Sequence, residues 1–234
     1  MQGLRYIFHG RAKGGDSLQR EIIKKVKDKK IIAIVRNVYG DDCRKLAQAL
    51  FDGGIELMEF TFDQQEAKNW ERTCENIAMV RQKFAGKIDC GAGTVLTREQ
   101  VRMANKAGAR FIISPNCSKP VIEETVRLGM VSMPGAMTAS EIICASEYGA
   151  DFVKIFPIAD LGANYIKAIR GPISHIPLLA VGGVNEKNIA EFLDAGADGV
   201  GVGGDLVNKK WIAAGEFQKI TELAKKLVQN SKRG

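Results

Sequence analysis

Short apolar segments, typical of buried strands, alternate without interruption with longer amphipathic segments that are typical of helices. The predicted strands are residues 31–36, 55–62, 87–91, 110–114, 130–133, 152–156, 177–181 and 199–202. The predicted helices are residues 16–30, 41–52, 64–84, 97–107, 119–128, 138–149, 163–169, 185–195 and 211–228. Eight consecutive strand–helix units predict parallel strands joined by right-handed crossovers. We therefore predict an α/β fold, a (β/α)8 (TIM) barrel with an extra N-terminal helix.

A doubly wound open sheet is the competing architecture for such a pattern. The glycine fingerprint that a dinucleotide-binding fold carries after its first strand is missing here. The chain has 234 residues, and roughly 250 are typical of the barrel. No Pro/Ser-rich linker divides it, so we predict a single barrel domain over residues 16–234 behind an N-terminal extension, residues 1–15.

Composition argues against several other classes of protein. No segment approaches the roughly 18 apolar residues of a membrane helix, so we expect no membrane partner. The first twenty residues lack the apolar core and cleavage site of a signal peptide. Five cysteines occur singly, which is typical of reduced thiols in a cytoplasmic protein. With only two histidines, far apart, we predict no metal site, and we expect no cofactor.

The net charge of +7 is concentrated in residues 24–30 and 225–233. Lysines in helical or terminal segments normally form a solvated face, and no aromatic residues alternate with them as in a groove for single-stranded nucleic acid. We therefore expect no nucleic-acid binding, and a general attraction for anionic small molecules instead.

Polar residues collect where the predicted strands end, and in barrels of this kind the active site lies at the C-terminal ends of the strands. They are Arg36, Glu59, Thr61, Thr94, Ser114 with Pro115, Lys154, and the pairs Gly182–Gly183 and Gly203–Gly204.

Lys154 stands out among them because it interrupts a hydrophobic strand. Alternate side chains of a strand face the same way, so Lys154 shares a face with Phe152 and Phe156. Loss of hydration between aromatic rings favours the neutral amine and lowers the lysine pKa. A neutral lysine amine forms Schiff bases with carbonyl compounds. The structural alternative is a lysine at a strand end whose amine extends into solvent.

Glu59 shares a strand face with Leu57 and Thr61. A carboxylate inside a barrel costs several kcal/mol unless it is paired or neutralised. Near Lys154 it would be either a proton shuttle with a raised pKa or the partner in a structural ion pair.

The two glycine pairs follow the seventh and eighth predicted strands, where these barrels usually bind phosphate. Backbone N–H groups and a helix N-terminus can hold a phosphate there without a cationic side chain. The alternative is that the glycines only permit turns with positive φ.

These segments together resemble the 2-keto-3-deoxy-6-phosphogluconate / 4-hydroxy-2-oxoglutarate (KDPG/KHG) aldolase family of class I aldolases, over roughly residues 31–207. The motifs are Ile-Val-Arg36, Gly-Gly-Ile-Glu-Leu-Met-Glu59-Phe-Thr, Gly91-Ala-Gly-Thr-Val-Leu, Ile-Ser-Pro115, Pro134-Gly135 with Thr138-Ala-Ser-Glu141, Val-Lys154-Ile-Phe-Pro157, and the two glycine pairs.

The resemblance implies that Lys154 forms the Schiff base and that Glu59 shuttles protons. It implies substrate-binding residues as well: Arg36 and Thr94 at the carboxylate, Gly182, Gly183, Gly203 and Gly204 around the phosphate, and Pro115 and Phe156 in the same site. The implied protein is a metal-free homotrimer that cleaves a 2-keto acid phosphate, 2-keto-3-deoxy-6-phosphogluconate, to pyruvate and glyceraldehyde 3-phosphate.

Two positions depart from the family pattern. Many members have an arginine two residues after the threonine of the second strand, and here that residue is Asp63. An acid cannot replace a bidentate guanidinium. The alternatives are therefore another 2-keto acid, such as 4-hydroxy-2-oxoglutarate or a 2-keto-3-deoxy-phosphogalactonate-like substrate, with Asp63 recognising a hydroxyl or amine, or a barrel that binds a phosphorylated ligand without turnover. A serine common in the eighth-strand loop is Gly204 here, which keeps the backbone donor and loses a hydroxyl.

Overall fold

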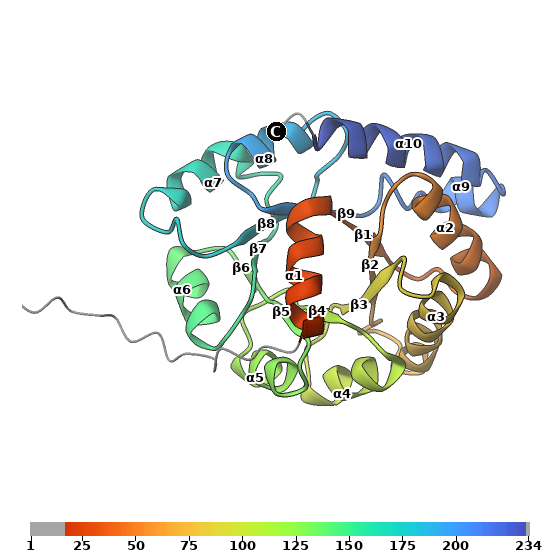
Figure 1. Ribbon diagram of the computed structural model, residues 1–234, viewed down its shortest axis with the longest axis horizontal. Helices are drawn as coiled ribbons and strands as arrows, with labels where there is room; N and C mark the ends of the chain where they lie inside the picture. The colour runs from red at the N-terminus through yellow and green to blue at the C-terminus, as the bar shows by residue number, and fades with distance from the viewer. Residues whose placement is uncertain (1–16, 233–234) are drawn as a thin grey trace, which may run out of the picture.

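A computed structural model describes residues 17–232, which form a single parallel sheet surrounded by helices (Figure 1). The predicted extension, residues 1–15, lies outside the described residues. The strands are β1 (Ile31–Val35), β2 (Leu57–Thr61), β3 (Asp89–Gly93), β4 (Phe111–Ile113), β5 (Val131–Met133), β6 (Gly135–Ala136), β7 (Val153–Ile155), β8 (Leu178–Val181) and β9 (Gly199–Val202). Their order in the sheet is β5-β4-β3-β2-β1-β9-β8-β7-β6.

The two ends of this sheet are joined by the chain itself. β5 pairs with β4 and β6 pairs with β7, and only Pro134 separates β5 from β6. The same segment bonds to β7, because Lys154 N donates to the Pro134 carbonyl at 2.8 Å and Asp151 N donates to the Ser132 carbonyl at 2.9 Å. The sheet is therefore a (β/α)8-like barrel. The fifth predicted strand, 130–133, corresponds to β5, whereas β6 was not predicted; it lies beyond Pro134, which has no N–H to donate.

The helices are α1 (Ser17–Lys29), α2 (Gly40–Asp52), α3 (Asn69–Phe84), α4 (Arg98–Ala107), α5 (Lys119–Arg127), α6 (Ala139–Glu147), α7 (Gly162–Arg170), α8 (Ile189–Asp194), α9 (Lys209–Ala213) and α10 (Phe217–Asn230). The predicted helix 211–228 is wrong as a single element: it is divided into α9 and α10 near Gly215, whose φ of +71° ends the first helix.

Two predicted helix starts were also placed too early. The predicted helix 64–84 begins at Asn69, because the Asp63 carboxylate accepts hydrogen bonds from the backbone of Gln65 and Glu66 and holds a turn there. The predicted helix 185–195 begins at Ile189, because the Asn185 side chain accepts from Lys187 N in a turn of its own. Asn and Asp side chains compete with helix formation in this way.

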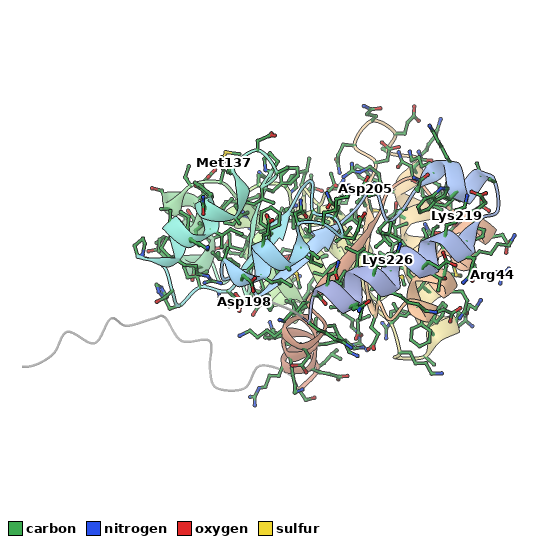
Figure 2. The ribbon with its side chains drawn as sticks, turned by 90° about the horizontal axis from the view of Figure 1, so that it is seen from above. Arg44, Met137, Asp198, Asp205, Lys219 and Lys226 are labelled. Atoms are coloured by element: carbon green, nitrogen blue, oxygen red, sulfur yellow. The ribbon has the colours of Figure 1, made fainter. Side chains whose placement is uncertain are left out.

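α1 lies across the centre of the ring of strands, as Figure 1 shows. Its buried Ile22 and Val26 pack with Ile32, Leu57 and Phe111, which point from the strands into the barrel. Figure 2 shows α1 on the opposite side of the molecule from Met137 and Asp205, which follow β6 and β9. α1 therefore covers the N-terminal end of the barrel and leaves the C-terminal end open.

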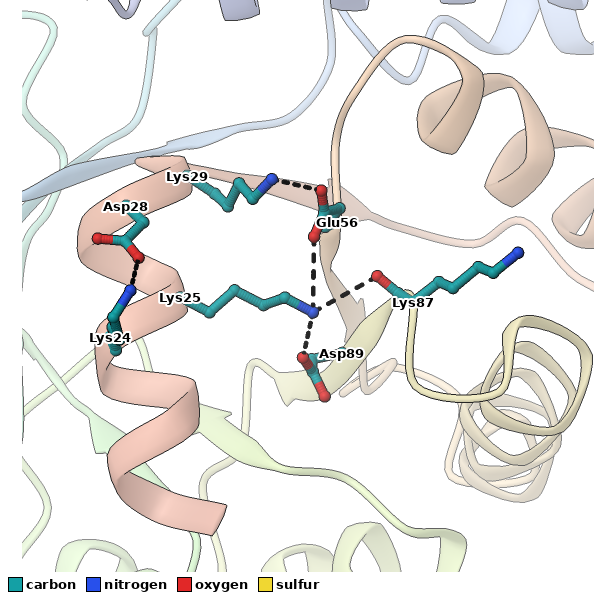
Figure 3. Close-up of polar contacts among 7 residues, drawn as sticks. All are labelled: Lys24, Lys25, Asp28, Lys29, Glu56, Lys87 and Asp89. Atoms are coloured by element: carbon teal, nitrogen blue, oxygen red, sulfur yellow. Dashed lines mark hydrogen bonds and ion pairs between the residues drawn. The ribbon is translucent and has the colours of Figure 1, made fainter. Parts of the chain in front are cut away.

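Ion pairs hold α1 in this position (Figure 3). The Lys25 amine lies 2.7 Å from the Asp89 carboxylate at the start of β3 and 3.6 Å from Glu56, which precedes β2. Lys29 contacts the other oxygen of Glu56 at 2.5 Å. The Lys25 and Asp89 side chains are mostly buried, so this contact is part of the packed end of the barrel.

Candidate active site

Lys154 is the central residue of β7, and only 6% of its surface is exposed. Its amine lies 4.7 Å from the centroid of the Phe156 ring. Burial disfavours the ammonium form and lowers the pKa of Lys154; the charge of Glu59 opposes this shift and the charge of Arg36 adds to it. The alternative of a solvated lysine at a strand end does not fit this burial.

Glu59 is the central residue of β2 and is 3% exposed. Burial raises the pKa of Glu59, and the positive charges of Lys154 and Arg36 offset the rise only in part. The pKa shifts of both groups thus favour their neutral forms. The opposite charges of the two groups act in the other sense, but burial is the larger cause for each pKa.

Gly93 provides the space that the Glu59 carboxylate occupies. A Cβ atom at position 93 would lie 1.6 Å from Oε1 and 2.3 Å from Cδ of Glu59. Gly91, on the same face of β3, is covered in a similar way by the Phe111 ring. Both glycines are visible in the motif Gly91-Ala-Gly. The role of Gly93 was not predicted, because it depends on a side chain of the neighbouring strand.

Arg36 and Thr94 lie together at the ends of β1 and β3, with Arg36 Nη2 donating to Thr94 Oγ1 at 3.4 Å. Thr94 has a φ of +53°, a left-handed conformation that is costly for a β-branched residue. Gln64 holds it there, because its Nε2 donates to the Thr94 carbonyl at 2.6 Å. The buried Gln100 at the start of α4 donates to Gln64 Oε1 at 3.2 Å. Gln64 was missed because the sequence pattern assigned it to a helix.

Asp63 directs its carboxylate to its own loop. It accepts hydrogen bonds from Asn69 Nδ2 at 3.0 Å, from Gln65 N at 3.0 Å and from Glu66 N at 3.3 Å. These bonds, the one from Asn69 above all, and the charge of Arg36 lower the pKa of Asp63. The carboxylate therefore serves the turn before α3, and its hydrogen-bonding capacity is largely used there.

The two glycine pairs differ in conformation. Gly182 and Gly183 have φ values of +99° and +80°, as a turn explanation requires, whereas Gly203 and Gly204 are not in the left-handed region. Gly203 and Gly204 share a cavity of about 470 Å³ with Arg36. The cavity is lined by Ile34, Arg36, Gly203, Gly204, Val207, Asn208, Lys209 and Lys210. Lys209 and Lys210 were not predicted as site residues, and they add positive charge there.

The remaining predicted residues lie on the β6 and β7 side of the barrel. Phe156 is 38% exposed, covers the Lys154 amine, and would lie 3.3 Å from a Cβ atom at Gly182. The Pro115 carbonyl packs so closely on Gly135 that a Cβ there would lie 2.3 Å from it. The structure thus places Pro115 next to β6, and Phe156 between Lys154 and Gly182.

The fold and the site together define a class of protein. A barrel that presents a buried amine and a buried carboxyl group on inward faces of β7 and β2 is suited to carbonyl chemistry through a Schiff base. Residues 22–223 match the model of the family described as KDPG and KHG aldolase, and the chain belongs to that family. The resemblance inferred from the motifs is confirmed.

Relatives with different sugar acid substrates are similarly close. The chain is 37% identical over 177 residues to the 2-dehydro-3-deoxy-6-phosphogalactonate aldolase of Escherichia coli K12, covering 75% of this chain and 83% of the relative. It is 36% identical over 202 residues to a 2-dehydro-3-deoxy-phosphogluconate aldolase of Treponema pallidum, covering 86% and 92%.

A solved structure of KDPG aldolase from Legionella pneumophila, with pyruvate captured as a covalent carbinolamine, matches with a TM-score of 0.76 at 28% identity. The match covers 85% of this chain and 94% of that one.

Within residues 17–232 no helix is long and apolar enough to cross a membrane. In the same range no three His, Cys, Asp or Glu side chains form a group that could hold a metal ion.

Proposed function

We propose that the protein is a class I aldolase that forms a Schiff base at Lys154 and cleaves 2-keto-3-deoxy-6-phosphogluconate to pyruvate and glyceraldehyde 3-phosphate. The observation that carries the proposal is a buried lysine of lowered pKa in a strand core, in the electrostatic range of a buried carboxyl group of raised pKa. A relative that holds pyruvate as a covalent carbinolamine supports the same chemistry.

The reaction begins with attack of the neutral Lys154 amine on the keto carbon. The carboxyl group of Glu59 donates a proton to the carbinolamine hydroxyl, which leaves as water; this gives a protonated imine that acts as an electron sink, and it leaves Glu59 ionised. Glu59, directly or through water, accepts the proton of the C4 hydroxyl as the C3–C4 bond breaks and the aldehyde leaves. The remaining enamine takes up a proton at C3, and water hydrolyses the imine to release pyruvate and restore the amine.

Charge complementarity supports the assignment of the binding residues. Arg36 and Thr94 would hold the carboxylate, while the glycines after β8 and β9 would receive the phosphate through backbone N–H groups. Lys209 and Lys210 line the same cavity as Gly203 and Gly204 and would attract the dianionic phosphate. Phe156 and Pro115 would border the reacting carbon atoms.

Asp63 favours a second candidate substrate, the phosphogalactonate compound. The family arginine at this position is absent, and the Escherichia coli relative named above acts, by its name, on the phosphogalactonate compound. The two substrates differ at C4, where the hydroxyl loses its proton. Side-by-side kcat/KM values for the phosphogluconate, phosphogalactonate and 4-hydroxy-2-oxoglutarate compounds decide between them.

Borohydride trapping tests the Schiff base. Wild-type protein incubated with pyruvate and borohydride should gain the mass of one reduced pyruvate adduct on Lys154. Lys154→Ala should remain folded, show no adduct and lose cleavage. Absence of an adduct on wild-type protein, or appreciable cleavage by Lys154→Ala, would contradict the proposal.

The cytoplasm is the proposed location. All five cysteines are free thiols, as a reducing compartment favours. Fractionation of the source cells checks this assignment.

A further inference from the structure

The Thr61 hydroxyl is a buried polar group that the described protein leaves unsatisfied. Thr61 is the last residue of β2, it is 3% exposed, and within residues 17–232 its Oγ1 has no hydrogen-bond partner. Leaving a buried hydroxyl without a partner destabilises the folded protein, because the group loses its hydrogen bonds to water. Most buried polar groups in native proteins have partners, so this one requires a functional or structural reason.

The register of the strands places Thr61 beside the groups proposed to bind the carboxylate. Thr61 shares its face with Leu57, which packs inside the barrel, and with Glu59. Val35 pairs with Phe60, so Arg36 follows beside Thr61 on one side. On the other side Thr61 pairs with Gly93, and Thr94 follows. Thr61 thus lies between the strand ends that carry Arg36 and Thr94, one inward-facing position nearer the mouth than Glu59.

The backbone around Thr61 is held on both sides. The Thr61 carbonyl accepts a hydrogen bond from Thr73 Oγ1 at 3.2 Å. Phe62 N donates to the Gly93 carbonyl at 2.8 Å. A β-branched side chain on such a backbone has few rotamers. The hydroxyl therefore has a well-defined position.

We propose that the Thr61 hydroxyl donates a hydrogen bond to the carboxylate of the 2-keto acid, next to Arg36 and Thr94. The proposal rests on the proposed function. A carboxylate offers about four acceptor positions, more than one guanidinium and one hydroxyl fill. Asp63 offers no donor from its carboxylate, which is already used by its own turn. Thr61 supplies a neutral donor at the site where many family members add a second arginine.

Pyruvate is the suitable probe, because it carries the carboxylate and keto group and lacks the rest of the sugar acid. Borohydride trapping at graded pyruvate concentrations gives the half-saturating concentration for wild type, Thr61→Val and Thr61→Ser. Valine has the shape of threonine without the hydroxyl. We expect it to raise the half-saturating concentration about tenfold or more, because hydrogen bonds to charged groups contribute about 1.5–3 kcal/mol. Serine should restore most of the affinity.

Thr125→Val is the matched control. Thr125 is also buried, on α5, and its hydroxyl donates to the Val121 carbonyl at 2.7 Å. This variant should lose thermal stability and bind pyruvate as wild type does. Thr61→Val should show the reverse, weaker pyruvate binding with no loss of stability, because it removes a hydroxyl without a protein partner.

The outcomes separate this proposal from the proposed function. An adduct on wild type with the same half-saturating pyruvate concentration in Thr61→Val would overturn the role of Thr61 alone. A lower kcat for cleavage at unchanged half-saturation would place the hydroxyl at the reacting atoms and would also overturn the carboxylate assignment. No adduct on wild type would overturn the proposed function, and the role of Thr61 with it.

Discussion

At the scale of single residues, the site depends on glycines that leave room for larger side chains beside them. Lys154 and Glu59 carry the chemistry proposed above, and both were identified from strand alternation, because a charged residue on an inward face is visible in the sequence. Gly93 and Gln64 were not identified. Their roles lie in a contact with a neighbouring strand and in a loop hydrogen bond, which no periodicity encodes.

Gly93→Ala tests whether cleavage requires the observed position of the Glu59 carboxylate. The new methyl group would overlap Oε1 and Cδ, which belong to the end of a side chain that can rotate away. We expect a folded protein whose kcat for cleavage falls about 100-fold or more, the usual contribution of general acid–base catalysis. Steady-state cleavage kinetics and circular dichroism measure the two effects.

Gly171→Ala is the control for this substitution. A Cβ at Gly171 would meet only the Ala168 carbonyl at 3.5 Å, an ordinary contact, so kcat should stay unchanged. Wild-type kcat in Gly93→Ala would show that the carboxylate can act from another position.

At the scale of elements, α1 is the part of the fold that distinguishes one end of the barrel from the other. Its apolar residues enter the same cluster as the inward-facing residues of β1, β2 and β4. Its lysines reach carboxylates at the starts of β2 and β3 (Figure 3). The amphipathic pattern predicted a helix over residues 16–30. The position of this helix against the barrel depends on ion pairs between distant parts of the sequence.

Lys25→Met should destabilise the protein and leave catalysis intact. The change leaves the buried Asp89 carboxylate without the amine at 2.7 Å, while the methionine keeps most of the apolar contact. We expect a loss of about 2 kcal/mol, between the values for exposed and fully buried pairs, and a Tm lower by roughly 4–8 °C. Differential scanning calorimetry measures the shift, and cleavage assays below Tm should give the wild-type kcat.

Lys24→Met provides the comparison on the same helix, since Lys24 pairs with Asp28 on the solvent-exposed face (Figure 3). Its effect should stay within about 0.5 kcal/mol. Equal Tm shifts in the two variants would argue that α1 is held by its apolar face alone.

At the scale of the whole molecule, the strand–helix alternation was sufficient to predict the barrel. Eight units with inward-facing apolar residues leave few other ways to bury both faces of a parallel sheet. Three details required the structure: the interruption of the fifth strand at Pro134, the division of the last helix near Gly215, and the turn that Asp63 holds before α3. Each depends on one backbone conformation or side-chain hydrogen bond, to which a pattern averaged over ten or more residues is insensitive.

The homotrimer implied by the family resemblance is a prediction at this scale. One chain has a mass of 25.5 kDa. Multi-angle light scattering of the purified protein should therefore give about three times that mass over a range of concentrations. A mass of one or two chains at micromolar concentration would contradict the trimer and would leave the chemistry at Lys154 unaffected.

The position of α1 also determines which end of the barrel is open to substrate and products. Within residues 17–232, α1 and the inward-facing side chains fill the N-terminal end of the barrel, so we expect substrate to reach Lys154 from the C-terminal mouth. In the proposed reaction pyruvate stays covalently attached to that lysine after the bond breaks, so the aldehyde leaves first through the opening by which the substrate entered. In the direction of synthesis pyruvate binds first and the aldehyde then enters above it. In the proposed reaction the covalent bond at Lys154 therefore sets the order of binding and release, and the covered N-terminal end makes both products use the same opening.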